Sequence, residues 1–399
     1  MLLWSLLSLV VLLVLLFIGY FKLAPRIGSN PAGGRLAKLR SLPNYREGKL
    51  HNVVDTNMDM PLGTLLGVMW EFIKGAPGRE PKAVIPNVPF DRKAWDALPD
   101  TGFAFVWFGH SSLLLKVEGV TFLIDPVFGE RASTFSFAGP KRFNYREHMR
   151  VDLLPKLDVV LLSHDHYDHL CHETMRELLE AQKAVTVSSS NRDQMSRSMV
   201  RRAHHDNAVT LQFITALGVG AHLEHWGIAA SSIAEKAWWE SAEVGPVKLT
   251  LAPARHFSGR GLTNRFSTLW GSWAFECKGQ RIYFGADSGY SPTFKEVGER
   301  LGPFDLAFLE CGAYNERWSN IHMMPEETAQ AAVDVKAKVL MPIHWAKYSL
   351  GMHTWKEPIT RLSKKAVELN VELFTPRPGR IVRWPDSAAS ERWWEGWSE

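Results

Sequence analysis

A dense run of metal-binding side chains constrains this chain more than any other feature. Residues 163–169 read SHDHYDH and directly follow an apolar, β-branched segment. Histidines two positions apart on an extended chain project to the same side, so His164 and His166 can bind one metal ion. Asp168 and His169 come where the chain turns and can bind a second. A polar surface loop is the alternative interpretation, but such a loop does not need this order of ligands.

Three later segments each lead into another candidate ligand. All are short runs of apolar and β-branched side chains, which favour strands, as does the run at 158–162 before the first cluster. Any one of these ligands alone could be a structural residue, but together they predict that one edge of a sheet system gathers a metal site. The segments and their ligands are 247–253 with His256, 281–286 with Asp287, and 339–343 with His344.

The order of these ligands resembles the metallo-β-lactamase superfamily in its dinuclear hydrolase form. Further motifs between Phe103 and Tyr348 resemble the N-acyl-phosphatidylethanolamine-hydrolysing phospholipase D family and, more distantly, the ascorbate-6-phosphate lactonases. The Gly-Pro-Lys-Arg and Gly-Ala-Tyr elements are more specific than the metal motif. The motifs are Gly109-His110, Asp125-Pro126, Gly139-Pro140-Lys141-Arg142, Trp270-Gly271-Ser272-Trp273, Asp287-Ser288-Gly289-Tyr290, Gly312-Ala313-Tyr314 with Arg317-Trp318, and Ile343-His344-Trp345.

The resemblance implies two divalent metal ions. Asp287 is then the bridging and catalytic carboxylate, and Asp125 orients ligands or the attacking hydroxide. Nitrogen and carboxylate donors without thiolate suit zinc, and iron or manganese also fit. The resemblance assigns His164, His166 and His256 to one metal and Asp168, His169 and His344 to the other.

The periodicity of apolar side chains predicts an α/β domain, in agreement with the metallo-β-lactamase resemblance. Hairpins are expected over 113–124 and 273–285, and helices over 172–181 and 325–335. This combination predicts an αββα sandwich in which two mixed sheets face each other and helices cover both outer faces. We assign residues 99–399 to this hydrolase domain.

Composition narrows the function further. The net charge of +4 over 399 residues is too small to indicate a nucleic-acid partner. The three cysteines are widely spaced and do not suggest a disulfide framework. Cys171 follows the ligand cluster closely, and burial as a small apolar side chain is the interpretation we favour.

The N-terminus predicts a membrane anchor. Residues 1–21 carry no charge and are long enough to span a bilayer as a helix, so we assign 1–22 to a transmembrane signal anchor. A cleaved signal peptide is the alternative, but the basic region at its start is missing. Basic residues that precede the first acidic one, Glu47, predict a cytoplasmic catalytic domain by the positive-inside rule, and can also contact anionic headgroups. They are Lys22, Arg26, Arg35, Lys38, Arg40 and Arg46.

Residues 23–98 are basic and then rich in proline and glycine, which indicates a linker and N-terminal extension with one short helix at 62–73. Tryptophan pairs suit either a membrane interface or the core, with the core as the commoner case. They are Trp238-Trp239 and Trp393-Trp394, with Trp397 close by.

Substrate-binding residues are harder to predict. His322 stands before Pro325, where a helix is predicted to start. The N-terminal amides of that helix would lie beside His322 and could bind a phosphate. Glu326 and Glu327 compete for the same amides. His322 also matches a functional histidine of the phospholipase family, and we expect it to contact phosphate or donate a proton. Other candidates are His110, which could instead orient a ligand or pack, and Lys141, Arg142 and Arg317, which could instead be surface cations. We interpret His204, His205, His222 and His225 as surface or packing residues.

These observations predict a membrane-anchored phosphodiesterase of the phospholipase D type, in which a metal-bound hydroxide attacks the phosphorus of N-acyl-phosphatidylethanolamine or a related phospholipid. A lactonase or other hydrolase of a phosphorylated small molecule is the alternative. A non-catalytic anchored scaffold is a third, disfavoured because the ligand set is complete. An apolar groove beside the metals would favour the lipid enzyme. The resemblance also implies that the protein can form a homodimer.

Overall fold

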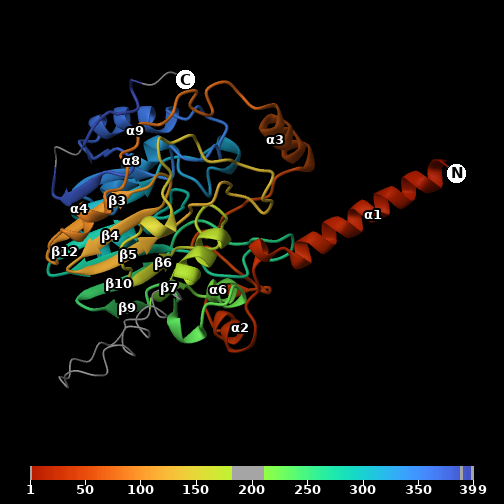
Figure 1. Ribbon diagram of the computed structural model, residues 1–399, viewed down its shortest axis with the longest axis horizontal. Coiled ribbons are helices and arrows are strands. Elements are labelled where there is room, and N and C mark those ends of the chain that lie inside the picture. The colour runs from red at the N-terminus through yellow and green to blue at the C-terminus, as the bar shows by residue number, and fades with distance from the viewer. Residues whose placement is uncertain (1, 182–210, 387–389, 397–399) are drawn as a thin grey trace, which may run out of the picture.

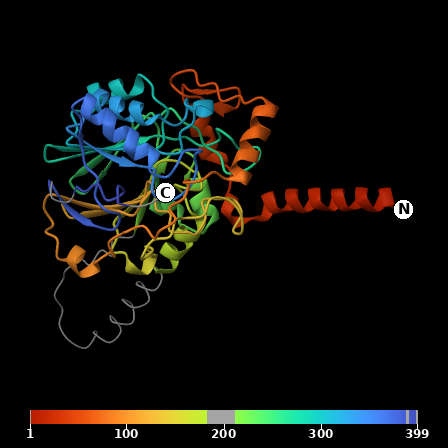
Figure 2. The same ribbon diagram turned by 90° about the horizontal axis from the view of Figure 1, so that it is seen from above.

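The computed structural model describes residues 2–181, 211–386 and 390–396. Two seven-stranded sheets face each other, with helices on their outer sides (Figures 1 and 2). This is the αββα sandwich expected from the sequence. The first sheet has the order β16 (Ile381–Trp384), β3 (Phe103–Trp107), β4 (Leu113–Val117), β5 (Val120–Ile124), β6 (Val159–Leu162), β7 (Gln212–Ala216) and β8 (Ile233–Lys236). The second has the order β15 (Glu372–Leu373), β14 (Val339–Ile343), β13 (Leu306–Glu310), β12 (Gln280–Phe284), β11 (Ser272–Cys277), β10 (Val247–Ala252) and β9 (Ser241–Val244).

Each sheet is antiparallel on one side and parallel on the other. The predicted hairpins are confirmed: β4 pairs with β5, and β11 pairs with β12 with Trp273 opposite Phe284. Strands β5 to β8 and β12 to β15 are parallel. The carboxyl ends of parallel strands lie at one edge of a sheet, so both sheets present the loops that follow these strands at a common edge.

Aromatic side chains fill the space between the sheets. Phe122 of the first sheet meets Phe275 of the second edge to face, with 5.5 Å between ring centroids. Phe105 and Phe308 make the same kind of contact at 5.2 Å. All four rings are buried. Strands buried on both faces read as continuous apolar runs, which explains the strand-like segments of the sequence.

The helices flank this core. On the second sheet, α8 (Pro325–Asp334) packs on β13 and β14, α9 (Glu357–Glu368) packs on β15 and on α8, and α7 (Thr293–Arg300) contacts α8. On the side of the first sheet lie α4 (Arg92–Asp96), a helix over residues 172–181, and α6 (Gly220–His225), which contacts β8. Short 3₁₀ turns occur at η2 (Val151–Leu153), η3 (Ala230–Ser232) and η4 (Glu316–Trp318).

The N-terminal extension lies against the hydrolase domain. It contains η1 (Pro25–Ile27), α2 (Gly33–Arg40), the two-stranded β1 (Tyr45–Arg46) and β2 (Lys49–Leu50), and α3 (Leu62–Lys74). Leu39 and Leu50 are buried in the main core. The extension therefore packs on the folded body.

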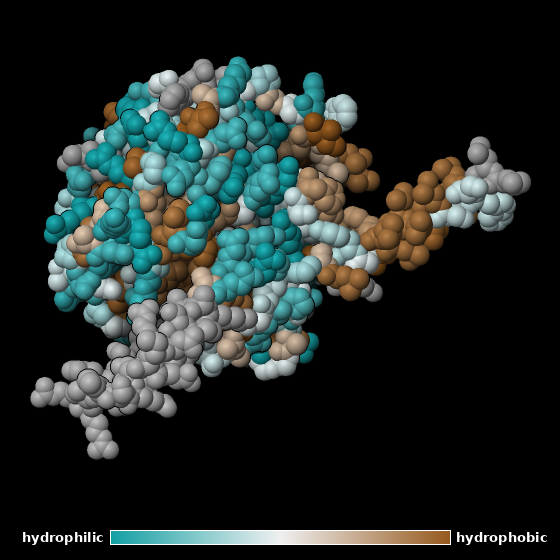
Figure 3. Space-filling view, in the orientation of Figure 1, coloured by the Kyte–Doolittle hydropathy of each residue, from teal (hydrophilic) through white to brown (hydrophobic). Residues whose placement is uncertain are grey.

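The first helix, α1 (Leu2–Leu23), projects away from this body (Figure 1). Its window Trp4–Phe21 is long and apolar enough to cross a membrane, and no part of that window is buried. Figure 3 shows apolar surface along most of it, with paler, more polar residues at its outer end. At its base, the Tyr20 hydroxyl donates to the carbonyl of Thr134 (2.7 Å), and Arg26 pairs with Glu173 (2.6 Å).

The tryptophan pairs divide between core and rim. Trp393 and Trp394 are buried, with Trp393 stacked on Trp345 at 5.2 Å. Trp238 and Trp239 are half-buried, and the indole N–H of Trp238 donates to the carbonyl of Trp270 (2.6 Å). Packing explains all four, and Trp397 lies outside the described residues.

Candidate metal centre

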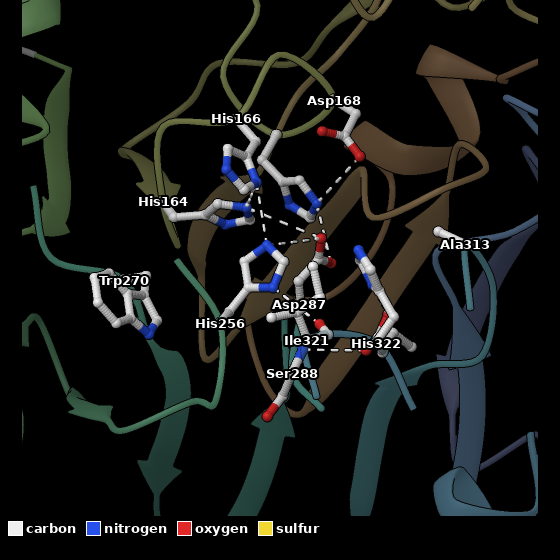
Figure 4. Close-up of polar contacts among 12 residues, drawn as sticks. His164, His166, Asp168, His256, Trp270, Asp287, Ser288, Ala313, Ile321 and His322 are labelled. Carbon is white, nitrogen blue, oxygen red and sulfur yellow. Dashed lines mark hydrogen bonds and ion pairs between the residues drawn. The ribbon is translucent and has the colours of Figure 1, made fainter. Parts of the chain in front are cut away.

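The seven predicted metal ligands come together at the edge where the strands end. Figure 4 shows five of them, His164, His166, Asp168, His256 and Asp287. His164, His166, Asp168 and His169 follow β6 of the first sheet. The second sheet supplies the other three from the ends of three strands: His256 after β10, Asp287 after β12 and His344 after β14. The site therefore depends on both sheets, and neither sheet alone contains all the donors.

One group of donors consists of His164, His166, His256 and Asp287, whose ligand atoms lie within 4.8 Å of one another. His166 Nδ1 lies 3.0 Å from His164 Nε2 and 3.1 Å from His256 Nε2. Asp287 Oδ2 lies 3.9 Å from His164 Nε2 and 3.7 Å from His256 Nε2. Three imidazole nitrogens and a carboxylate oxygen thus point into one small space, as a tetrahedral metal site requires.

A second group consists of His110, Asp168, His169 and His344. Asp168 Oδ2 lies 3.2 Å from His344 Nε2 and 3.7 Å from His169 Nε2. Asp287 reaches this group too, with Oδ1 3.1 Å from His169 Nε2 and Oδ2 3.1 Å from His344 Nε2. The Asp287 carboxylate therefore stands between the two groups, where a bridging ligand would be.

The donor atoms of the two groups cannot all be satisfied by hydrogen bonds to one another, but divalent cations could satisfy them. His166 Nδ1 faces two other imidazole nitrogens, yet it can hold only one proton. His169 Nε2 and Asp287 Oδ1 are buried without a hydrogen-bond partner, although they face each other. Buried polar atoms without partners are costly, and a metal ion shared among these atoms removes that cost.

The electrostatics of the site also favour a cation. Burial works against the charged forms, but the carboxylates of Asp287 and Asp168 outweigh it and hold the pKa of His169 well above its usual value. For the same reason the pKa of His344 rises to about 10, with Asp287 as the main charge partner. By contrast, burial lowers the pKa of His164 and of His256. The carboxylates therefore attract positive charge to this space, and two divalent ions would supply it.

Residues behind the ligands hold them in place. The Asp125 carboxylate accepts from the backbone N–H of Ser163 (2.8 Å) and lies 2.8 Å from His169 Nδ1. Burial raises the pKa of Asp125, and the hydrogen bonds from His169 and Ser163 oppose that shift. The carbonyl of Ile321 lies 2.9 Å from His256 Nδ1. Asp125 thus orients His169 from behind, and it does not line the pocket over the site.

His110 has a similar orienting contact. Its Nε2 lies 2.9 Å from Asp168 Oδ2, and burial lowers the pKa of His110 to about 3, so a neutral imidazole holds the carboxylate. The backbone of His110 and His344 is left-handed, with φ of 55° and 64°. The His344 N–H donates to the carbonyl of His110 (3.0 Å), and the His110 N–H donates to the carbonyl of Trp345 (3.0 Å). Non-glycine residues adopt this conformation uncommonly, in turns as well as at functional sites, and these two bonds hold it in place here.

Glu310 is a buried acid that the sequence analysis missed. Its Oε2 lies 2.7 Å from His322 Nδ1 and 3.8 Å from His344 Nδ1, and its Oε1 accepts from the backbone N–H groups of Ser288 and Met323. Glu310 ends β13 just as the ligands follow their own strands, which is the signal that could have found it. It links His322 to the metal ligands.

His322 lies beside the centre and faces a pocket. Figure 4 shows its imidazole next to Asp287, and its Nδ1 lies 2.7 Å from Glu310 Oε2. The pocket has a volume of about 330 Å³ and is lined by His322, by four of the predicted ligands and by several apolar side chains. His322 is therefore placed to reach a substrate bound at the metal centre.

The helix that follows His322 does not offer the expected phosphate corner. The helix α8 begins at Pro325 as predicted, but Glu327 of its first turn turns back and accepts from the backbone N–H of Met324 (2.9 Å). Glu326 pairs with Arg361 (2.7 Å). Acidic side chains of the helix itself thus occupy its N-terminal end, so at this corner the His322 side chain, and not the helix amides, is available to a phosphate.

Two of the basic substrate candidates lie away from the pocket. Lys141 is largely exposed and pairs with Glu130 (3.1 Å), so it is a surface cation. Arg142 donates to the carbonyl of Phe128 (2.5 Å) and stabilises a loop. Neither residue lines the pocket over the metal centre, which corrects their assignment as substrate residues.

Arg317 does line the pocket, and its guanidinium pairs with Glu71 of α3 (2.6 Å). The pocket also contains Arg265, a cation that the sequence analysis did not single out. The Arg265 guanidinium lies over the ring of Phe257, 4.6 Å from its centroid. Cation–π contact of this kind positions an arginine without neutralising its charge.

The other histidines that the sequence set aside are outside the centre. His222 is buried, and its Nε2 lies 3.2 Å from Asp165 Oδ2. His225 is exposed. His204 and His205 lie outside the described residues. Cys171 is buried, as expected, and burial raises the pKa of its thiol.

Replacement of Asp125 tests its orienting role. We expect Asp125→Asn to lower metal affinity by about 10-fold to 100-fold, because the charge that orients His169 is lost. Competition with a chelator of known affinity measures this. Lys141→Gln, which removes an exposed charge outside the site, is the control. An unchanged affinity in Asp125→Asn would show that His169 needs no such support.

Comparisons with known proteins agree with this geometry. A family described as Beta-lactamase superfamily domain matches residues 121–212 and 179–345. An uncharacterised protein of Mycobacterium tuberculosis (strain ATCC 25618 / H37Rv) is 36% identical over 372 residues, which cover 92% of this chain and 91% of that protein.

Two further relatives have informative names. The N-acyl-phosphatidylethanolamine-hydrolyzing phospholipase D 1 of Caenorhabditis elegans is 32% identical over 287 residues, which cover 66% of this chain and 73% of that protein. The outer membrane protein RomA of Klebsiella pneumoniae is 55% identical over 92 residues, which cover 23% of this chain and 69% of that protein. The chain therefore belongs to the metallo-β-lactamase superfamily, as a metal-dependent hydrolase related to the N-acyl-phosphatidylethanolamine-hydrolysing phospholipases D.

Proposed function

We propose that this protein is a membrane-anchored phosphodiesterase of the phospholipase D type, acting on N-acyl-phosphatidylethanolamine or a related phospholipid. The observation that carries the proposal is the pocket of about 330 Å³ over the metal centre, where polar donors meet an apolar wall. Acyl chains bind against an apolar wall of this kind, whereas a phosphorylated sugar or lactone presents mainly polar groups to its site. The apolar lining consists of Met58, Met60, Phe257, Trp318, Ile321 and Leu350.

The charges of the pocket also suit a phosphodiester. Arg265 and Arg317 bring guanidinium groups to the same pocket as the metal ligands. Guanidinium binds phosphate oxygens through paired hydrogen bonds. Because Arg317 is already paired with Glu71, Arg265 is the stronger candidate for the substrate phosphate.

We further propose that the centre holds two divalent ions, with zinc as the best fit and iron or manganese as alternatives. His164, His166 and His256 would hold one, Asp168, His169 and His344 the other, and Asp287 both. Ions bound there activate water and neutralise anionic oxygens. Asp125 and His110 act by orienting ligands.

The remaining chemical requirement is a proton for the leaving group. Hydrolysis adds water to phosphorus and breaks the bond between phosphorus and the oxygen of the amine-side alcohol, which must gain a proton. His322 lines the pocket and is oriented by Glu310 at 2.7 Å. We propose that it donates that proton or a hydrogen bond to a phosphoryl oxygen.

A lipid panel tests the substrate class. Metal-loaded protein should release phosphatidate and the N-acylated ethanolamine from N-acyl-phosphatidylethanolamine in equal amounts, and His166→Ala should abolish both. Hydrolysis of a phosphorylated lactone or sugar phosphate with no action on any phospholipid would instead support the alternative hydrolase.

The His322→Ala variant tests the proton donor. We expect phosphodiester turnover to fall by about 10² to 10³ with metal content unchanged, because one transition-state contact is lost and the ligands remain. The control is His225→Ala, which removes an exposed histidine outside the pocket. Metal loss in His322→Ala would make His322 a ligand, and an unchanged rate would remove it from the mechanism.

We propose that α1 spans the membrane and that the catalytic domain is cytoplasmic, because the basic residues nearest the span lie on its C-terminal side. External protease should leave the domain intact in cells or spheroplasts and digest it after lysis. Digestion of the domain by external protease would show that the domain lies outside the cytoplasm. A shortened N-terminus in the purified protein would identify a cleaved signal peptide. Homodimer formation remains a prediction that light scattering of the detergent-solubilised protein can test.

A further inference from the structure

Helix α3 carries its apolar stripe on the outside of the protein. Large apolar side chains recur along it at the spacing of one helix face, and each is 42% to 75% exposed. We call this set the α3 stripe. Amphipathic helices of globular domains normally turn such a stripe toward the core. The stripe consists of Leu62, Leu65, Leu66, Met69, Trp70 and Ile73.

The other side of α3 holds the helix to the domain. Val68 is the buried apolar residue of the helix. Glu71 pairs with Arg317 (2.6 Å), and the Arg79 guanidinium lies over the ring of Phe72, 4.7 Å from its centroid. Because these contacts fix which face of the helix turns inward, the outward position of the stripe follows from the fold. The stripe therefore forms an apolar surface that the domain itself does not cover.

The position of α3 indicates what covers that surface. Figures 1 and 2 both place α3 on the side of the body from which α1 projects, and Figure 3 shows apolar surface over both. The base of α1 is held to the body through Tyr20 and Arg26. A bilayer crossed by α1 would therefore lie next to α3. Lys74, exposed at the C-terminal end of α3, suits anionic headgroups.

The helix adjoins the rim of the catalytic pocket without lining it. The four residues 57–60, just before α3, line the pocket, and so does Arg317, the partner of Glu71. Any contact of α3 with a bilayer would thus bring the mouth of the pocket to the headgroup layer. A lipid could then reach the metal centre with its acyl chains still close to the membrane.

We propose that α3 is a second membrane contact, which lies in the bilayer interface by its apolar stripe and turns the catalytic pocket toward the lipid. This inference deepens the proposed function and rests on its membrane span, but it does not depend on which lipid is cleaved. Interfacial helices bind in this way, with the apolar face buried at the boundary of headgroups and acyl chains.

Site-directed spin labelling of the full chain tests the contact without any activity assay. The three native cysteines are buried, so a cysteine introduced at Ile73 can be labelled selectively. The matched control is Val367→Cys on α9, because Val367 is 71% exposed and Ile73 is 75% exposed. Both variants are reconstituted in vesicles of phosphatidylcholine and phosphatidylglycerol.

We expect the label at position 73 to collide several-fold more often with oxygen, which concentrates in the bilayer, and less often with a water-soluble nickel complex, than the label at position 367. Equal accessibility at the two positions would overturn the proposal. A label at position 73 shielded from both reagents, in a dimer that Leu66→Asp dissociates, would also overturn it, because a second copy of the chain would then cover the stripe.

A kinetic test separates this contact from the substrate hypothesis. The double change Leu66→Asp with Ile73→Asp should lower the rate on lipid in vesicles by at least about tenfold, since two large side chains lose their burial, and leave the rate on detergent-dispersed lipid unchanged. Equal losses on both forms of substrate would contradict a docking role. If the label contacts the bilayer but the protein hydrolyses no phospholipid, the membrane contact of α3 stands and the phospholipase assignment is wrong.

Discussion

The structure depends on a small space in which buried carboxylates and imidazoles face one another. Asp287 is buried and Asp168 is half-buried, and burying charge of one sign is costly unless opposite charge compensates for it. Positive charge can compensate for the buried carboxylates where the strand ends of the two sheets converge, because histidines from both sheets surround Asp287 there. The αββα arrangement thus acts as a frame whose packed core keeps the two strand edges, and with them the donors, at a fixed separation.

Support for this space extends beyond the two sheets. Asn52 of the N-terminal extension donates to the carbonyl of His256 (2.8 Å) and accepts from its N–H (3.0 Å). Arg260 is buried and donates to the carbonyls of Asp165, Leu170 and Arg26. The segment next to the anchor and the loop that carries the first ligands are therefore joined by one guanidinium. Movement of the extension would disturb ligands that are far from it in the sequence.

The parts that the sequence predicted are those set by local pattern. Residues 163–169, and strands that each lead into a ligand, follow from side-chain periodicity and from the way parallel strands end, so the fold and the clustering of seven donors could be expected. Glu310 ends β13 and so carries the same strand-end signal as the ligands. The contributions of Asn52 and Arg265 depend on which loops meet in space, which one sequence does not specify. Lys141 was misplaced for the same reason: a basic motif gives the charge of a loop and not the direction in which it points.

The orientation of helix α3 also could not be predicted from the sequence. Its periodicity marks an amphipathic helix, but periodicity cannot tell whether the apolar face turns to a core or away from it. The contacts of Glu71 and Phe72 decide that question by holding the opposite face to the domain. Since the extension between α1 and α3 is packed on the body, the direction of the anchor, the exposed stripe and the mouth of the pocket are set together. Orientation toward a lipid surface is then a property of the folded chain as a whole.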